Sequence, residues 1–280
     1  MLALERRNQI LERLQAERRV VVSELSQLYG VSEETIRRDL DKLEKDGYAR
    51  KSYGGAVFNE DVSIELPFNI RKNHNTAGKQ RIAELVVPLI HDGEKLFLDA
   101  SSTAVFIAKA LKCRQRLTVI TNSVEILLEL SGVSGWDVIA TGGRMNEDYL
   151  AFLGTRTEEF IHSYHVDTAV MSCKALSLEH GIMESQEAFA TVKRAMMACA
   201  GRSILAVDST KFDQTAFTVG ADLKETGILV TDREPSAPWQ AYLQELGITC
   251  LYSEQRSEEE ITCSEEERSR SEEEKSDENL

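Results

Sequence analysis

The sequence predicts an α/β protein in two parts, an N-terminal winged helix-turn-helix domain over residues 1–57 and a Rossmann-like α/β domain over 77–252. The first prediction rests on residues 31–47, whose apolar side chains recur with the spacing of a short amphipathic helix. The second rests on the stretch after residue 77, in which short apolar runs alternate with helix-like segments. Such alternation is typical of a mostly parallel sheet with helices on both faces.

The segment 31–47 is expected to form the second helix of the helix-turn-helix. Ile36, Leu40 and Leu43 fall on one helical face, and charged side chains fall on the opposite face. Ser32 is a favourable N-cap residue, and Gly47 is typical of the C-terminal end of a helix. From spacing alone, an ordinary helical hairpin with a solvated charged face explains the pattern equally well.

The flanking residues favour the winged helix. A shorter helix, capped by Ser23 and closed by Gly30, should precede the turn. Residues 20–22 are a β-prone valine run, and residues 47–57 contain two short strand-like stretches around a Gly-Gly bend. Helix, strand, helix, turn, helix and hairpin occur in the order of a winged helix.

Charge is distributed in a way that suits DNA as a partner. The formal net charge of the chain is −14, yet residues 1–56 carry 11 Lys and Arg against 10 Asp and Glu. Residues 253–280 carry 4 against 12, and with few apolar residues they are expected to be a disordered acidic tail. We interpret this tail as a solubilising extension, the alternative being an acidic mimic that competes with DNA.

The stretch VSELSQLYGVSEETIRRDLDKLEKDGYARKSYGGA resembles the N-terminal signature of DeoR-type bacterial transcription regulators. Tyr53 stands where many members have histidine. The resemblance implies binding to double-stranded operator DNA, with the second helix in the major groove and the wing on phosphates. The residues expected at this interface are Ser32, Thr35, Arg37, Arg38, Lys42, Arg50 and Lys51.

Other features exclude several classes of protein. No apolar stretch approaches the roughly 18–20 residues of a membrane helix, and the N-terminus is charged, so we expect a cytoplasmic protein without membrane contact. Five cysteines at irregular spacings include no C-x-x-C pair, so we expect reduced thiols, no metal site and no cofactor.

Residues 58–76 contain Pro67 and lack a sustained period, which indicates a linker between the two domains. Arg71 and Lys72 in this segment are interpreted as solvated charges, the alternative being contact with phosphates.

The α/β domain is expected to contain regular alternating elements. The predicted strands span 95–99, 117–121, 137–141, 166–172, 203–207, 227–231 and 248–252. A first helix is predicted from residue 77 onward, and the other predicted helices span 103–112, 124–131, 155–163, 187–200 and 238–246.

Polar residues cluster where these strands end, which is where ligands bind in parallel sheets. This edge of the sheet suits a phosphate, because it combines serines and threonines before a helix, glycines that allow close backbone approach, and lysines at strand ends. Taken singly, each group is also an ordinary helix cap or turn. The expected ligand-binding residues are Asp99, Ser101, Ser102, Thr103, Thr121, Asn122, Ser123, Gly142, Gly143, Lys174, Glu187 and Lys211. For Lys193, ligand contact and a surface position are equally consistent with the sequence.

This half is similar to the sensing domain of DeoR-type regulators, which is itself similar to ribose-5-phosphate isomerases and CoA transferases. The resemblance implies a phosphorylated sugar effector that controls DNA affinity, most simply as a repressor of a sugar-utilisation operon, and a homodimer or higher homo-oligomer. Alternatives are an activator or an isomerase-like enzyme with a fused helical domain. Isomerases of this type have a proton-transferring glutamate where Val192 precedes Lys193, which argues against an enzyme.

Overall fold

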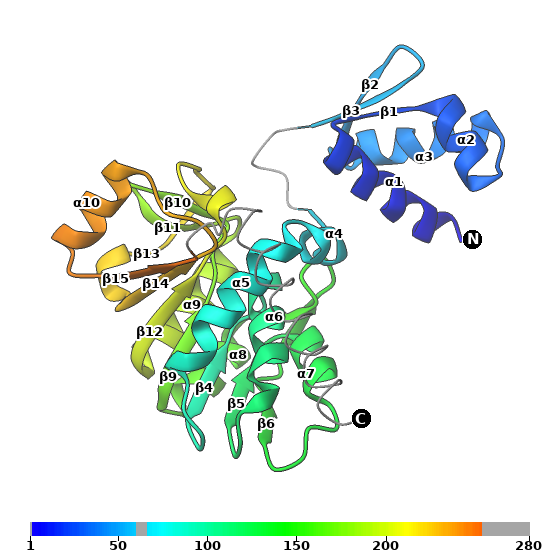
Figure 1. Cartoon of the computed structure of the whole chain (residues 1–280). Coiled ribbons are helices and arrows are strands. Elements are labelled where there is room, and N and C mark those ends of the chain that lie inside the picture. The colour runs from blue at the N-terminus through cyan, green and yellow to red at the C-terminus, as the bar shows by residue number, and fades with distance from the viewer. Residues whose placement is uncertain (1, 60–65, 254–280) are drawn as a thin grey trace, which may run out of the picture.

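A computed structural model describes residues 2–59 and 66–253 of the chain. It contains a small N-terminal domain beside a larger α/β domain (Figure 1). The N-terminal domain consists of α1 (Ala3–Glu17), β1 (Arg19–Val21), α2 (Val22–Tyr29), α3 (Glu33–Lys45), β2 (Ala49–Ser52) and β3 (Gly55–Phe58). The three strands form an antiparallel sheet in the order β1-β3-β2, so the predicted winged helix is confirmed.

Helix α3 begins and ends as its sequence predicts. Ser32 Oγ accepts a hydrogen bond from the backbone N–H of Thr35 at 3.3 Å. Gly47 adopts φ 86°, which lets the N–H groups of residues 47 and 48 bond back to the last turn. The predicted cap at Ser23 is wrong: α2 already begins at Val22, its N-cap is Val21, and no side chain caps it.

The wing depends on two adjacent glycines. Gly54, at φ 75°, lies in the tight turn between β2 and β3. Gly55 lies in β3 against β1, where a Cβ atom would lie 1.9 Å from the carbonyl oxygen of Val20. Any side chain at Gly55 would therefore separate the hairpin from β1.

Helix α4 (Phe68–Asn73) lies within the segment expected to be a linker. Phe68 is buried in the core of the α/β domain, whereas Ile70 is buried in the core of the winged helix. The segment is thus a packed helix shared by the two domains, and in Figure 1 it lies between them.

The α/β domain contains the predicted alternation. Its main strands are β4 (Lys95–Leu98), β5 (Thr118–Thr121), β6 (Asp137–Ala140), β9 (Val166–Met171), β12 (Ala200–Ala206), β14 (Ile228–Thr231) and β15 (Thr249–Tyr252). Its helices are α5 (Thr76–Val86), α6 (Ser102–Ala110), α7 (Val124–Leu130), α8 (Thr155–His162), α9 (Glu187–Ala198) and α10 (Ala237–Glu245).

The seven strands form one parallel sheet in the order β15-β14-β12-β9-β4-β5-β6. Successive side chains alternate between its faces: Leu96 and Leu98 pack with α5, α6 and α7, whereas Phe97 packs with α8, α9 and α10. The sheet is therefore covered by helices on both sides, which confirms the predicted Rossmann-like architecture.

Two smaller sheets were not predicted. A hairpin joins β7 (Arg144–Asn146) to β8 (Ala151–Leu153), and an antiparallel sheet contains β10 (Ala175–Ser177), β11 (Gly181–Glu184) and β13 (Thr218–Ala221). None of the described helices has the length and apolar character needed to span a bilayer. The described residues end at Ser253, so the rest of the predicted acidic tail lies outside them.

Candidate functional sites

The first candidate site is the exposed face of α3 with the wing. Ile36, Leu40 and Leu43 are buried against α1 and α2, which turns the charged side of α3 outward. The seven residues expected to contact DNA all lie on this side or on the wing: Ser32, Arg37, Arg38, Lys42, Arg50 and Lys51 are exposed and Thr35 is half-buried. The fold therefore presents them on one surface.

A buried ion pair holds α3 in place. Asp39, which follows the two arginines in sequence, points inward and is 4% exposed. Its carboxylate accepts a hydrogen bond from Arg6 Nε of α1 at 2.6 Å. Asp39 therefore positions the helix, while its two neighbours face outward.

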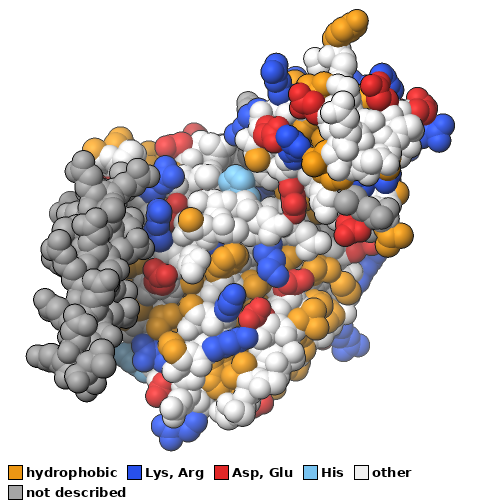
Figure 2. Space-filling model, turned by 45° about the vertical axis from the view of Figure 1, so that its right-hand side comes forward, with side chains coloured by type: hydrophobic (Ala, Val, Ile, Leu, Met, Phe, Trp, Pro, Cys, Tyr) orange, Lys and Arg blue, Asp and Glu red, His pale blue; other side chains and the backbone are white. Residues whose placement is uncertain are grey.

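Most cations of this surface are paired with carboxylates of the same domain. Arg37 lies 2.7 Å from Glu33, Arg38 lies 3.2 Å from Glu34, and Lys42 lies 3.2 Å from Asp46. Lys51 of the wing pairs with Asp41 on α3. Figure 2 shows red and blue side chains interspersed over this domain. Such exposed pairs are weak, so phosphates can replace the carboxylates.

The second candidate site is a cavity at the carboxyl ends of the parallel strands. Strands β4, β5 and β6 follow one another in one direction across the sheet, and β9, β12, β14 and β15 follow in the other. The direction reverses between β4 and β9, and ligands bind outside such a switch point. The cavity is lined by residues that follow both strands, Asp99 to Thr103 and Ser172 to Lys174.

Asp99 joins the two strands at this point. Its Oδ1 accepts a hydrogen bond from the N–H of Ser101 at 3.1 Å, and its Oδ2 accepts one from the N–H of Ser172, also at 3.1 Å. Ser101 is in turn the N-cap of α6, because its Oγ accepts from the N–H of Ala104. The first turn of α6 is therefore held with its N–H groups beside the cavity, where an anion is favoured.

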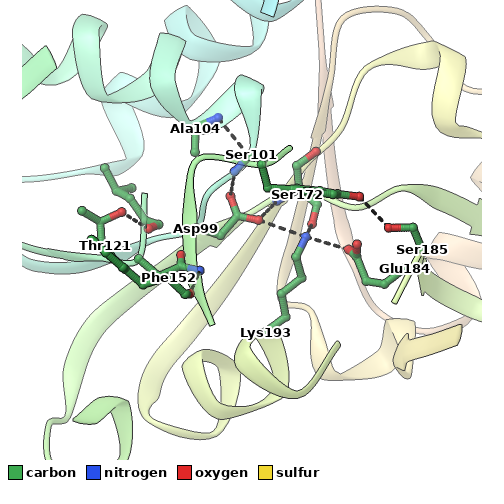
Figure 3. Close-up of polar contacts among 12 residues, drawn as sticks. Asp99, Ser101, Ala104, Thr121, Phe152, Ser172, Glu184, Ser185 and Lys193 are labelled. Carbon is green, nitrogen blue, oxygen red and sulfur yellow. Dashed lines mark hydrogen bonds and ion pairs between the residues drawn. The ribbon is translucent and has the colours of Figure 1, made fainter. Parts of the chain in front are cut away.

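Lys193 extends from α9 to this carboxylate (Figure 3). Its Nζ lies 3.0 Å from Asp99 Oδ2 and 2.6 Å from Glu184 Oε1, and it also donates to the carbonyl oxygen of Ser172. Burial lowers the pKa of Lys193, but the two carboxylates outweigh it and raise the pKa above its ordinary value. Lys193 is thus neither a surface charge nor an unpaired one.

The structure brings seven of the predicted ligand-binding residues to the cavity wall and leaves five elsewhere. Those at the wall are Asp99, Ser101, Ser102, Thr103, Asn122, Lys174 and Lys211. Thr121 Oγ1 donates to the carbonyl of Leu98, and Ser123 caps α7. The Gly142 carbonyl and the Cα of Gly143 lie against Thr157 of α8, and Glu187 is exposed at the start of α9. These five residues have structural positions away from the cavity wall.

Sequence reasoning did not place α4, α5 or the β7–β8 hairpin at the cavity, and it interpreted Arg71 as a solvated charge. Arg71 lines the cavity, with its guanidinium carbon 4.2 Å from the ring centroid of Tyr149. His74 and Lys79 also line it. Lys72, by contrast, pairs with Glu125 at 2.8 Å. The sequence around Pro67 has no helical period and no recognisable motif, so it did not predict that this segment forms part of the cavity wall.

The cavity is positively charged. Its lining includes Arg71, Lys79, Lys174, Lys193 and Lys211 against Asp99, Glu184 and Asp208. Burial raises the pKa of Asp208, but Lys211 and the Thr210 hydroxyl outweigh it and hold the pKa below its ordinary value. Burial lowers the pKa of His74. Five cations therefore face three carboxylates in a chain whose formal net charge is −14.

A winged helix joined to an α/β domain with a cavity at its switch point defines a DNA-binding regulator with a sensor domain. Two family models match this division: the DeoR-like helix-turn-helix domain matches residues 6–62, and the DeoR C terminal sensor domain matches residues 74–233. The chain belongs to the DeoR family of transcriptional regulators.

Full-length relatives support this assignment. The uncharacterized HTH-type transcriptional regulator YulB of Bacillus subtilis is 38% identical, with 83% of this chain and 90% of the relative covered. The transcriptional repressor AccR of Agrobacterium fabrum is 33% identical, with 81% and 89% covered. The L-fucose operon activator of Haemophilus influenzae is 34% identical, with 84% and 94% covered.

Among solved structures, ribose 5-phosphate isomerase A of Methanocaldococcus jannaschii matches 49% of this chain and 55% of its own. The identity is 18% and the TM-score is 0.37. This partial likeness supports no statement about activity.

Proposed function

We propose that the protein is a repressor of a sugar-utilisation operon, that it binds operator DNA through α3 and the wing, and that a phosphorylated sugar in the switch-point cavity controls this binding. The observation that carries the proposal is the cationic cavity at the N-terminus of α6. Helix N-termini and lysines favour phosphate. Relatives named as transcriptional repressors make repression the simplest assignment.

The phosphate is expected at the first turn of α6, close to Lys174 and Lys211. Ser102 and Thr103 begin this helix and line the cavity. Their hydroxyl and backbone N–H groups donate to phosphate oxygens, and the lysines neutralise its charge.

The remainder of the cavity suits a sugar. Among the described residues, Asn122 Oδ1 is buried and makes no hydrogen bond, so it accepts a sugar hydroxyl at no cost to another contact. Tyr149 and Phe189, whose ring centroids are 3.8 Å apart, both line the cavity and give its wall an apolar part beside the carbon atoms of a sugar.

We do not expect the cavity to be an active site. Val192 lines the cavity. The resemblance to ribose-5-phosphate isomerases implies a proton-transferring glutamate directly before the lysine of this helix, and a valine transfers no proton. Lys193 is held charged by Asp99 and Glu184, so it cannot accept a proton at neutral pH. Measurable isomerisation of ribose 5-phosphate would contradict this assignment.

Specific operator binding is expected to need a homodimer or higher homo-oligomer in the cytoplasm. One winged helix buries too little surface for tight specific binding, and two copies read paired half-sites. Sedimentation of the full chain with selected DNA tests this stoichiometry.

DNA binding is tested with Arg38→Ala. Sites are first selected from a pool of random duplexes with the wild-type chain, and affinity is then measured by fluorescence anisotropy. Loss of one exposed cation from the recognition helix should weaken specific binding roughly 5–150-fold, equivalent to about 1–3 kcal/mol. The matched control is Arg156→Ala on α8, which also removes an exposed arginine from a helical carboxylate pair. Equal affinities of the two variants would remove α3 from the interface.

Effector binding is tested with Ser102→Glu, which places a carboxylate where the phosphate is expected. Thermal stabilisation by a panel of hexose and pentose phosphates should disappear, while binding to selected DNA persists. Ser236→Glu, at the exposed N-terminus of α10, is the matched control. Lys211→Met is a second test that leaves α6 intact. Undiminished stabilisation in both cavity variants would place the effector elsewhere.

A further inference from the structure

Helix α4 is fixed to both domains at once. Phe68 is 2% exposed in the α/β core, and Ile70 is 1% exposed in the winged-helix core. The N–H of Phe68 donates to the carbonyl of Asp148 at 2.9 Å, and Asn73 Nδ2 donates to Glu12 Oε1 of α1 at 2.6 Å. A helix of six residues is not stable alone, so these two sets of contacts determine its position.

The same helix forms part of the cavity wall. Arg71 and His74, at the C-terminal end of α4, line the cavity together with Lys79 of α5. Gln15 of α1 also lines it, so the winged helix contributes directly to the wall. A molecule in the cavity therefore lies against the element that joins the two domains.

Lys79 holds the end of α4. Its Nζ donates to the carbonyl oxygen of Arg71 at 2.6 Å and to that of His74, which are among the last carbonyls of the helix. Lys79 is 2% exposed, and within the described part of the chain the acceptors of its Nζ are these two carbonyl oxygens. It is a buried cation held by neutral acceptors.

The electrostatic surroundings make Lys79 responsive to an anion. Burial is the largest effect and lowers its pKa to about 8. Arg71 and Lys211 act in the same direction, whereas Asp208 and Asp232 act against it. A phosphate brings the charge partner that the carbonyls do not supply, and a charged partner forms the stronger hydrogen bond.

We infer that α4 and Lys79 transmit the occupancy of the cavity to the winged helix: an anion that draws the Lys79 ammonium away from the carbonyls of Arg71 and His74 releases the last turn of α4. Ile70 and Asn73 then carry this movement to α1. The inference rests on the proposed function, because it deepens the regulation of the same cavity. The coupling between two sites of this kind typically changes affinity about 5–150-fold.

The test measures the ratio of DNA affinities with and without effector. The probes are inorganic phosphate, ribose 5-phosphate and glucose 6-phosphate, added to the full-length chain and selected DNA. In Ile70→Ala and Asn73→Ala, the ratio should fall toward one, while direct binding of the probe stays within about twofold of wild type. The matched control is Val20→Ala, which truncates the same winged-helix core from β1 and should keep the wild-type ratio.

Lys79→Met tests the holding residue itself. Without the ammonium, the DNA affinity in the absence of probe should equal that of wild type with probe, and added probe should change it no further. If Ile70→Ala fails to fold, Asn73→Ala decides alone, because Asn73 is exposed.

The outcomes separate the two proposals. A wild-type chain that binds none of the probes overturns the proposed function, and the inference with it. A wild-type chain that responds to a probe, together with Ile70 and Asn73 variants that respond equally, overturns the inference alone.

Discussion

Replacing Lys193 with methionine is expected to destabilise the α/β domain by about 3–5 kcal/mol, the usual cost of removing one partner of a buried ion pair. The Asp99 and Glu184 side chains are each 3% exposed, and Lys193 Nζ lies 3.0 and 2.6 Å from them. Asp99 keeps two backbone N–H donors without the lysine. Lys193→Met removes from both buried carboxylates the cation that lies between them.

Unfolding of this domain can be followed selectively. The chain has two tryptophans, Trp136 and Trp239, and both lie in the α/β domain. Their fluorescence in urea should show the loss, and the melting temperature should fall by roughly 10 °C, at about 2–4 °C per kcal/mol for a domain of this size.

The control is Lys112→Met, which removes an exposed pair with Glu129, 2.6 Å long, and should cost about 0–1 kcal/mol. A variant within about 1 kcal/mol of wild type at neutral pH would refute the reasoning, because it would mean that Asp99 and Glu184 do not need Lys193.

Two buried cations, Lys79 and Arg6, give further predictions. Burial lowers the pKa of Lys79 to about 8, so this lysine loses its proton between about pH 7 and 9. A phosphate monoester, with a pKa near 6, no longer titrates in this range. The affinity for phosphate, measured by calorimetry, should therefore fall several-fold between about pH 7 and 9 in the wild-type chain but not in Lys79→Met. In the absence of ligand, the folded state binds fewer protons than the unfolded state between about pH 8 and 10.5, so stability should rise with pH there. Among the described residues, Arg6→Met leaves Asp39 with one ion-pair partner, Arg7 at 3.9 Å, and hydrogen exchange of α3 should show a loss of about 2–4 kcal/mol; unchanged protection would show that the pair of Arg6 and Asp39 does not hold the helix.

Elements with a single packing face were predictable from the sequence. In α3, Ile36, Leu40 and Leu43 face one core, so helical spacing identifies both the helix and its exposed side. The strands of the large sheet were predictable for a related reason. In the inner strands, from β14 to β5, short apolar runs are buried on both faces of the sheet.

Helix α4 was missed because its two apolar side chains serve different cores. Phe68 and Ile70 are two residues apart and pack in opposite domains, so no helical period arises in the sequence. The segment also contains Pro67, which indicates a turn when it is read locally. The strands of the small sheets are three or four residues long, too short for their pattern to be distinguished.

The charge states of Lys79 and Lys193 depend on contacts that only the folded chain reveals. Lys193 on α9 is paired with Asp99, which follows β4, and Lys79 is held by carbonyls at the end of α4. Both side chains are almost fully buried, a position that the charge of a lysine never suggests by itself.

The pKa values of Lys193 and Lys79 are shifted in opposite directions. We expect this difference to let one part of the cavity stay fixed while another responds to a ligand. Two carboxylates raise the pKa of Lys193, so this cation is saturated and fixes the ends of β4 and β9 whether or not a ligand is bound. Burial without such a partner lowers the pKa of Lys79, so its free energy depends strongly on an added anion. A ligand can shift a conformational equilibrium only through groups whose interactions differ between the two states. Lys79 meets this condition and Lys193 does not, which is why the regulatory signal is expected to pass through α4.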